Sequence, residues 1–282
     1  MNDPLVKVYS PSSTITYHES AAKWALRYIE KYQPRKTNKA DLSRIAGSGF
    51  HAGIGAYRKG LATPEKSADI AYSIVEKTIL EREEKGFEYE SDLIEQVETL
   101  PALVHITLLR FIAADPIPKD WKLIEVDPWL KEYACRPDEV WEVPSGAYTF
   151  VDYKFKPRLD KKYHAETLVE FDYDWQMYHY AWAVPLAYSK VLYDYHVGLV
   201  VAAPRFTPYL QAYTVDKENM RLWVKSAHQD WDDMAKIETG ERYPAHNFVW
   251  RGRWGRDPYA DAFTSCRLDP QLLREKYIKT GD

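Results

Sequence analysis

The feature of this sequence that most constrains its fold is a change in hydrophobic period near Trp121. Before that point, apolar and aromatic residues recur every three to four positions, a spacing typical of amphipathic helices. After it, runs rich in Val, Ile, Tyr, Phe and Trp predict strands at 121–126, 138–143 and 147–155. The pattern therefore favours an α/β protein whose N-terminal portion is helical.

Capping signals and periodicity predict the remaining elements. Thr63-Pro64-Glu65 reads as a helix N-cap, a proline at the first helical position and an acid matched to the helix dipole. Further helices are expected from Ser12–Thr14 to about Tyr32, at 48–59, around 175–183 and at 217–237. A helix at 91–113 is expected to kink or break near Pro101. Two further strands are expected at 191–203 and 209–215. We expect one domain over 1–282: a mainly helical part at 1–115, an α/β core at 116–240 and a C-terminal loop or tail at 241–282.

The segment RPDEVWEVPSGAYTFVDYKFKP carries the most chemical information. Pro137-Asp138 opens one predicted strand, and Asp152-Tyr153-Lys154 ends the next, with a tight-turn signal between them. Side chains alternate along a strand, so Asp152 and Lys154 share one face while Tyr153 points away and leaves its carbonyl near the same place. Antiparallel pairing can bring Asp138 alongside. Oxygen ligands of this kind suit Mg²⁺ or Mn²⁺, and an adjacent lysine can orient water.

A solvated ion pair at a strand end is the structural alternative for Asp152 and Lys154. The same spacing of an acid and a lysine recurs at Glu83 and Lys85, at Asp120 and Lys122, and at Asp160 and Lys162. Those pairs lie in a helical charge run or in predicted loops. Only Asp152 follows an apolar strand and a turn with a Pro-Asp upstream, which favours the functional interpretation.

With these residues in place, the sequence resembles the PD-(D/E)xK nuclease superfamily, and within it the RecB-like branch that includes the CRISPR-associated exonucleases. The resemblance extends over roughly residues 10–240 in consistent order. It implies a restriction-endonuclease-like fold, with a mixed central sheet flanked by helices. It also implies that His51, Asp138, Asp152 and the Tyr153 carbonyl are metal ligands, that Lys154 and Gln176 join the acids in catalysis, and that Tyr180 and Glu125 contact substrate.

Each residue added by the resemblance also has a plainer interpretation. His51 can be a packed or hydrogen-bonded helix histidine. Gln176 and Tyr180, four apart on one helical face, can be polar residues at the edge of an aromatic core. Asp127 competes with Glu125 for the acid at the end of the preceding strand.

The chain departs from the branch in its cysteines. Many CRISPR-associated exonucleases hold an iron-sulfur cluster with one cysteine near the N-terminus and three near the C-terminus. Here Ala21 and Ala22 lie in the corresponding N-terminal region, and the two cysteines present are Cys135 and Cys266. We therefore expect neither an iron-sulfur cluster nor a disulfide framework. No GxxxxGK[ST] sequence occurs, so no ATP-driven motor is expected.

Charge allows a local track for nucleic acid but not a coat of bulk positive charge, because the formal net charge is −4. Lys156 and Arg158 come after the predicted catalytic residues and are candidate substrate contacts. A second run, from Trp250 to Arg256, interleaves tryptophan and arginine as single-strand channels do, although a solvated loop explains it equally.

These observations together predict a Mg²⁺- or Mn²⁺-dependent DNA nuclease, in particular an exonuclease acting in recombination, repair or phage DNA processing. Its partner would be single-stranded DNA or duplex ends, with recombination or repair proteins as further partners. A nuclease-fold DNA-binding or scaffold protein without activity, and an RNA nuclease, are the alternatives. The polar start and the absence of a long uncharged apolar run predict a cytoplasmic protein, of a bacterial cell or a phage-infected host, with no membrane association.

Overall fold

The central sheet is mixed and six-stranded. The computed structural model describes residues 7–244, 251–252, 255–256, 259, 262 and 268–280. The strands run in the order β4-β5-β6-β7-β8, and β9 pairs with β7 beside β8. Their bounds are β4 Lys122–Val126, β5 Glu139–Glu142, β6 Tyr148–Arg158, β7 Leu192–Ala203, β8 Thr207–Pro208 and β9 Gln211–Tyr213. All neighbours are antiparallel except β6 and β7, which are parallel.

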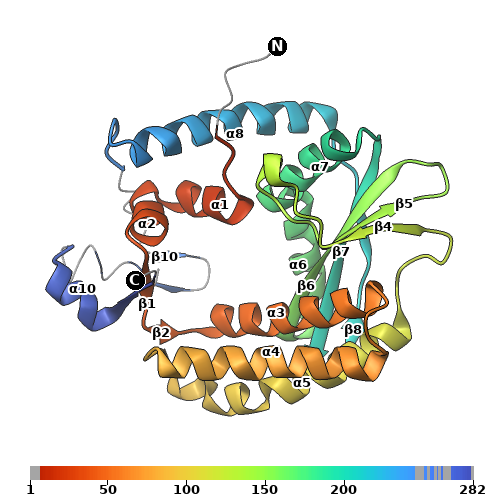
Figure 1. The fold of residues 1–282 in the computed structure, drawn as a ribbon, viewed down its shortest axis with the longest axis horizontal. Coiled ribbons are helices and arrows are strands. Elements are labelled where there is room, and N and C mark those ends of the chain that lie inside the picture. Colours follow the sequence, from red (N-terminus) through yellow and green to blue (C-terminus); the bar gives the residue numbers. More distant parts are fainter. Residues whose placement is uncertain are drawn as a thin grey trace.

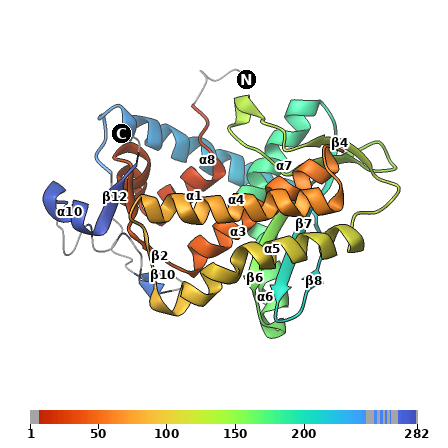
Figure 2. The same ribbon diagram turned by 60° about the horizontal axis from the view of Figure 1, so that its bottom comes forward.

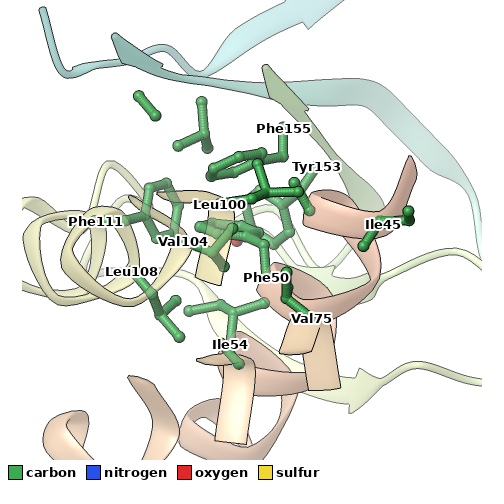
Figure 3. Close-up of a cluster of buried hydrophobic side chains, with 14 of the residues drawn as sticks. Ile45, Phe50, Ile54, Val75, Leu100, Val104, Leu108, Phe111, Tyr153 and Phe155 are labelled. Carbon is green, nitrogen blue, oxygen red and sulfur yellow. The ribbon is translucent and has the colours of Figure 1, made fainter. Parts of the chain in front are cut away.

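Three long helices cover one face of this sheet: α3 (Lys39–Arg58), α4 (Pro64–Glu84) and α5 (Ile94–Ala114). They lie side by side in Figures 1 and 2. Figure 3 shows the core between them and the sheet, where Phe50 of α3 meets Phe111 of α5 and Tyr153 of β6. Thr63 caps α4 as predicted, its side chain accepting from the Lys66 backbone N–H.

A second helical layer covers the opposite face. The crossover from β6 to β7 runs through α6 (His164–Glu170) and α7 (Trp175–Tyr188), as a parallel connection requires. Outside α7 lie α8 (Lys217–Glu238), α1 (Pro11–Glu19) and α2 (Ala21–Trp24). An aromatic cluster joins this layer, including Trp24, Trp223 and Trp231. The sheet is thus covered on both faces.

Three helix boundaries differ from the sequence-based expectation. The first helix is interrupted at Ser20, whose extended backbone lets its side chain accept from the Lys23 N–H and start α2. α3 begins at Lys39 rather than near 48, because Leu42, Ile45 and Ala46 already face the core. α5 continues through Pro101 without a break, preceded by a 3-10 turn at Ser91–Leu93.

The C-terminal segment was expected to be a loop or tail, but residues 270–279 are ordered into secondary structure. They form α10 (Pro270–Lys276) and β12 (Tyr277–Lys279), which pairs with β1 (Tyr32–Pro34). Leu273 and Tyr277 are buried there against Leu26 and Tyr32. The partner strand of β12 lies near the other end of the sequence, so the C-terminal segment itself carries no periodic pattern of hydrophobic residues. For this reason its composition suggested a tail. Cys266 and the run from Trp250 fall largely outside the described residues.

α5, with its preceding turn, is the one helix within the described ranges that is long and apolar enough to cross a membrane by length and composition. Its inner face is nevertheless the centre of the core, with Leu100, Val104, Leu108 and Phe111 almost fully buried. The place of α5 in the core of the α/β structure therefore explains its apolar composition.

Candidate active site

The predicted acids and lysine lie where β5 ends beside the continuing β6. Asp138 directly precedes β5, and the register pairs Glu139 with Val151, so the position of Asp138 falls opposite Asp152. Asp138 Oδ2 accepts from the Tyr153 backbone N–H at 2.6 Å. The backbone of Tyr153 therefore faces the edge where β5 has ended, and its carbonyl lies on that same edge.

Asp152 and Lys154 form a buried ion pair on β6. Lys154 Nζ lies 2.7 Å from Asp152 Oδ2 and donates to Gln176 Oε1 at 2.7 Å. Gln176 in turn donates to the Tyr180 hydroxyl at 2.6 Å. The two α7 residues lie four apart on one helical face, and Asp174 caps that helix by accepting from the Gln176 backbone N–H. The order Asp152, Lys154, Gln176, Tyr180 is thus one continuous polar chain between strand and helix.

His51 approaches the same acids from α3. Its Nδ1 lies 3.1 Å from Asp138 Oδ1. Burial acts to lower the pKa of His51, but the Asp138 carboxylate outweighs that effect and the pKa is raised. The charges of Asp152 and Lys154 act on His51 as well, so these side chains form one electrostatic cluster.

Burial also sets the protonation of Asp152, which is only 3% exposed. Loss of solvent raises the pKa of Asp152 to about 6, and the charge of Asp138 adds to the rise while Lys154 opposes it. For Lys154, burial lowers the pKa, but the Asp152 carboxylate outweighs burial and the pKa is raised. Each partner of the pair thus favours the charged form of the other.

The donor set suits a hard divalent cation in its chemistry. Despite their short contacts, His51 Nδ1 and Asp152 Oδ2 lack hydrogen-bonding geometry, so both are buried polar atoms without a hydrogen-bond partner. Such atoms are costly unless a ligand completes them. Within the described part of the chain, no three His, Cys, Asp or Glu side chains surround a single point closely enough to hold an ion. Lys154 supplies the positive charge next to Asp152 in this arrangement.

Glu139, which follows Asp138, was not anticipated. It is 1% exposed, accepts from the Tyr153 hydroxyl at 2.8 Å and from Trp141 Nε1 at 2.9 Å, and pairs with Arg58 Nε at 3.2 Å. Arg58 also forms a two-pronged pair with Asp115. Arg58 lies seven residues after His51 on α3, so the same helix is joined to β5 at two places. A sequence pattern cannot reveal a partner 81 positions away.

The structure does not bring the remaining candidates together with the acids. Glu125 accepts from the Tyr188 hydroxyl at 2.6 Å, at the far end of α7 from Gln176. Lys156 lies further along β6, where burial lowers its pKa while Glu170 opposes the shift. Arg158 lines a separate cavity of about 1150 Å³ between α5 and α6. That cavity is also lined by Asp92, Glu95, Asp160, Glu166 and Glu170, and so many acids disfavour a phosphate there.

A smaller pocket of about 230 Å³ adjoins the acid cluster. His51, Asp138 and Tyr153 line one side of it, and Asp127 and Arg136 line another. We assign this smaller pocket to the candidate site, because it is lined by Asp138 and by His51, whose Nδ1 is a buried atom without a hydrogen-bond partner.

A mixed sheet carrying paired acids and a lysine beside a β-hairpin defines the class of fold to which nucleases of the restriction-endonuclease type belong. The family model of the PD-(D/E)XK nuclease superfamily matches residues 8–250, and the chain belongs to that superfamily. Its members generally use divalent metal ions, and their class of substrate is nucleic acid.

The fold is also similar to that of a solved protein structure. That structure is the crystal structure of a protein named "Putative exonuclease" from Eubacterium rectale, with 12% sequence identity, a TM-score of 0.49, and coverage of 93% of this chain and 88% of that one. No curated protein sequence matches.

Proposed function

We propose that this nuclease is a Mg²⁺- or Mn²⁺-dependent DNA exonuclease acting in DNA recombination, repair or phage DNA processing. The observation that carries the proposal is the cluster of Asp138, Asp152 and Lys154 at the strand edge where β5 ends, in which Asp152 is buried and Asp138 lines a small pocket. His51, Asp138, Asp152 and the Tyr153 carbonyl are the ligands we assign. A bound divalent ion would polarise the phosphate and lower the pKa of a water molecule.

The side chains themselves have separable tasks in this scheme. Lys154 orients the attacking water and offsets charge on the phosphoryl group. Gln176 holds Lys154 Nζ through its carbonyl oxygen, and Tyr180 fixes the Gln176 amide so that this oxygen faces the lysine. Asp138 is fixed in turn by the Tyr153 N–H. The scheme needs no rearrangement of the β-strands, because every group is already anchored to a strand or helix.

The test is metal-dependent degradation of labelled DNA by the whole chain, with chelator as the control. Asp152→Ala should reduce the rate by at least about 10³-fold while the fold, followed by circular dichroism, is retained. Asp160→Ala is the matched control, because Asp160 has a lysine two positions later but is exposed and lines the other cavity. Retained cleavage in Asp152→Ala would refute the assignment.

A panel of substrates decides the finer points. Linear DNA degraded while circular DNA stays intact supports exonuclease action, whereas nicking of circular DNA contradicts it. Preferential cleavage of RNA would mean that the substrate is RNA rather than DNA. Binding of DNA without cleavage by the wild-type chain at any Mg²⁺ or Mn²⁺ concentration would mean that the fold serves as a scaffold.

A further inference from the structure

The connection between β4 and β5 has an ordered conformation that is held by backbone pairing and by side-chain packing. We call residues 127–138 the β4–β5 arm; it is the yellow-green loop beside α7 in Figure 1. Val126 pairs with Glu139 at the end of the two strands, and four residues further out Leu130 pairs with Cys135 in the same antiparallel register. The register therefore places Trp129 directly opposite Arg136, one position inside the Leu130–Cys135 bridge.

The tip of the arm is anchored from below. Leu130 and Cys135 are 9% and 1% exposed and pack with the core cluster under α7. His179 of α7 donates from Nε2 to the Tyr133 carbonyl at 2.7 Å. The arm is thus held at its base by the sheet and at its tip by α7, so its position relative to the acid cluster is fixed.

Against this anchored background, Trp129 is 57% exposed. An aromatic ring that is held exposed on a rigid segment offers a flat face on which another ring can stack. It adjoins Pro128, which lies opposite Pro137 in the same register, so both backbones lack a donor at that pair. Neither a strand nor a helix within the described residues continues the arm to cover Trp129.

Arg136 stands opposite Trp129 and lines the 230 Å³ pocket that also contains Asp138 and His51. Its Nε and Nη2 pair with the Asp127 carboxylate, and Lys59 Nζ lies 4.0 Å from that same carboxylate. A guanidinium has five N–H donors, and a side-on pair with one carboxylate uses two of them. Two cations thus share one acid that lines the pocket, and Arg136 keeps N–H donors beyond those it gives to Asp127.

The size of the pocket limits what enters it. A volume of about 230 Å³ corresponds to roughly seven or eight waters at about 30 Å³ each. That space suits a phosphodiester group with its hydration better than a whole nucleotide. A base attached to a phosphate in the pocket must therefore lie outside, along the arm.

From these observations we propose that the β4–β5 arm is a subsite for an unpaired nucleotide: Trp129 stacks on its base, and Arg136, supported by Lys59, binds the phosphate next to the one at the acid cluster. The proposal rests on the proposed nuclease function and names the preferred substrate as a single-stranded nucleic-acid end. Stacking needs an exposed base face, which a base inside a closed duplex does not offer.

The experiment measures binding of labelled oligonucleotides by fluorescence anisotropy, using the whole chain with Asp152→Ala to prevent cleavage. Trp129→Ala on that background should weaken binding of a single strand about tenfold, within a range of roughly 5- to 150-fold, and Trp129→Phe should restore most of it. Tyr243→Ala removes an aromatic residue that is 91% exposed after α8 and should change nothing. Binding of a covalently closed circular duplex, which has no ends and no hairpin loops, should be insensitive to Trp129→Ala.

Arg136 has its own readout. Arg136→Ala should reduce the slope of log affinity against log salt by about 0.7 for a single strand, as expected for one lost phosphate contact. The matched control is Arg221→Ala, which removes another exposed arginine that pairs with an acid, on α8. An unchanged slope would overturn the phosphate role.

Two failures are distinguishable. If wild-type protein cleaves DNA with metal but Trp129→Ala binds single strands like the Tyr243→Ala control, the subsite is refuted and the nuclease function stands. Equal losses on the single strand and on the closed circular duplex would also refute it, because stacking on an unpaired base cannot act on both. If wild-type protein cleaves no nucleic acid and Asp152→Ala binds none, the proposed function fails and the subsite fails with it.

Discussion

Asp138 and Glu139 are consecutive acids that the fold treats in opposite ways. Asp138 lies at the open strand edge, 3.1 Å from His51 and next to a pocket. Glu139 is buried, and its two oxygens are satisfied by Arg58, Trp141 and Tyr153. Burial raises the pKa of Glu139 while the Arg58 charge opposes the rise. One residue is left free for a ligand because the next is fully committed to structure.

Arg58→Ala should therefore be strongly destabilising. It leaves the Glu139 carboxylate buried without its cation, and removing one partner of a buried pair costs about 3–5 kcal/mol. Urea denaturation measures the loss, and Arg221→Ala, which removes an exposed ion pair, should leave the free energy of unfolding nearly unchanged. A loss for Arg58→Ala as small as that of the control would show that the Glu139 pair does not join α3 to β5.

Among individual residues, the sequence could predict only those contacts that local periodicity determines. Asp152 and Lys154 lie on one face of β6 because side chains two residues apart in a strand point to the same side. Gln176 and Tyr180 meet because side chains four residues apart in a helix lie on the same face. The Arg58–Glu139 pair depends on how α3 crosses the sheet, which no local pattern encodes. The contact of Glu125 with Tyr188 could not be predicted for the same reason, because Tyr188 comes from another layer, and the substrate role of Glu125 stays a prediction.

At the scale of elements, the glycines of α3 explain why a helix with poor propensity forms. A methyl group on Gly53 would come within 2.7 Å of the Ser67 carbonyl oxygen, and one on Gly49 within 2.6 Å of the Ala71 carbonyl oxygen. These glycines let α3 and α4 approach closely, and the packing gained offsets about 1 kcal/mol of lost propensity at each. At Gly55 the nearest atom is 3.8 Å away, on Val126.

Alanine substitutions at two of these glycines should have opposite signs. Gly53→Ala should destabilise by about 1–3 kcal/mol through overpacking against the α4 backbone, whereas Gly55→Ala should be neutral or stabilise by up to about 1 kcal/mol. The midpoint of thermal or urea denaturation reports both. Equal effects at the two positions would contradict the close approach of α3 and α4.

The elements themselves were predicted well where one face of a regular segment meets the core, as for α4, β6 and α8. Boundaries failed where tertiary contacts override local signals. α3 starts nine residues earlier than expected. The strand expected at 209–215 is shortened to β9, and a separate short strand, β8, precedes it on β7. Pairing of β1 with β12 could not be predicted, since neither strand is longer than three residues.

For the whole molecule, two buried neutral histidines tie stability to pH. Burial lowers the pKa of His179 and of His196 from 6.5 to about 4. Between pH 6.5 and about 4 the unfolded chain therefore binds more protons than the folded chain. The contribution of the two neutral histidines to stability is full above about pH 6.5 and is lost as the pH falls towards 4.

The free energy of unfolding should fall by up to about 1.4 kcal/mol per pH unit for each histidine across that window. Urea titrations at pH 7.5, 6.0 and 5.0 measure the slope, and His179→Gln should flatten it relative to wild type. A wild-type slope near zero would show that both histidines stay neutral in the unfolded chain or become charged in the folded one.

The ribbon of β1 and β12 has a consequence for the order in which the molecule is made. The Thr280 side chain and backbone both bond to the carbonyl of Lys31, 249 positions earlier. During synthesis at about 5–20 residues per second, Tyr32–Pro34 emerges on the order of ten seconds or more before its pairing strand exists. Until then the β1 segment, just ahead of the helix that bears His51, has no pairing strand of its own, and an unpaired strand edge is a template for pairing with another chain.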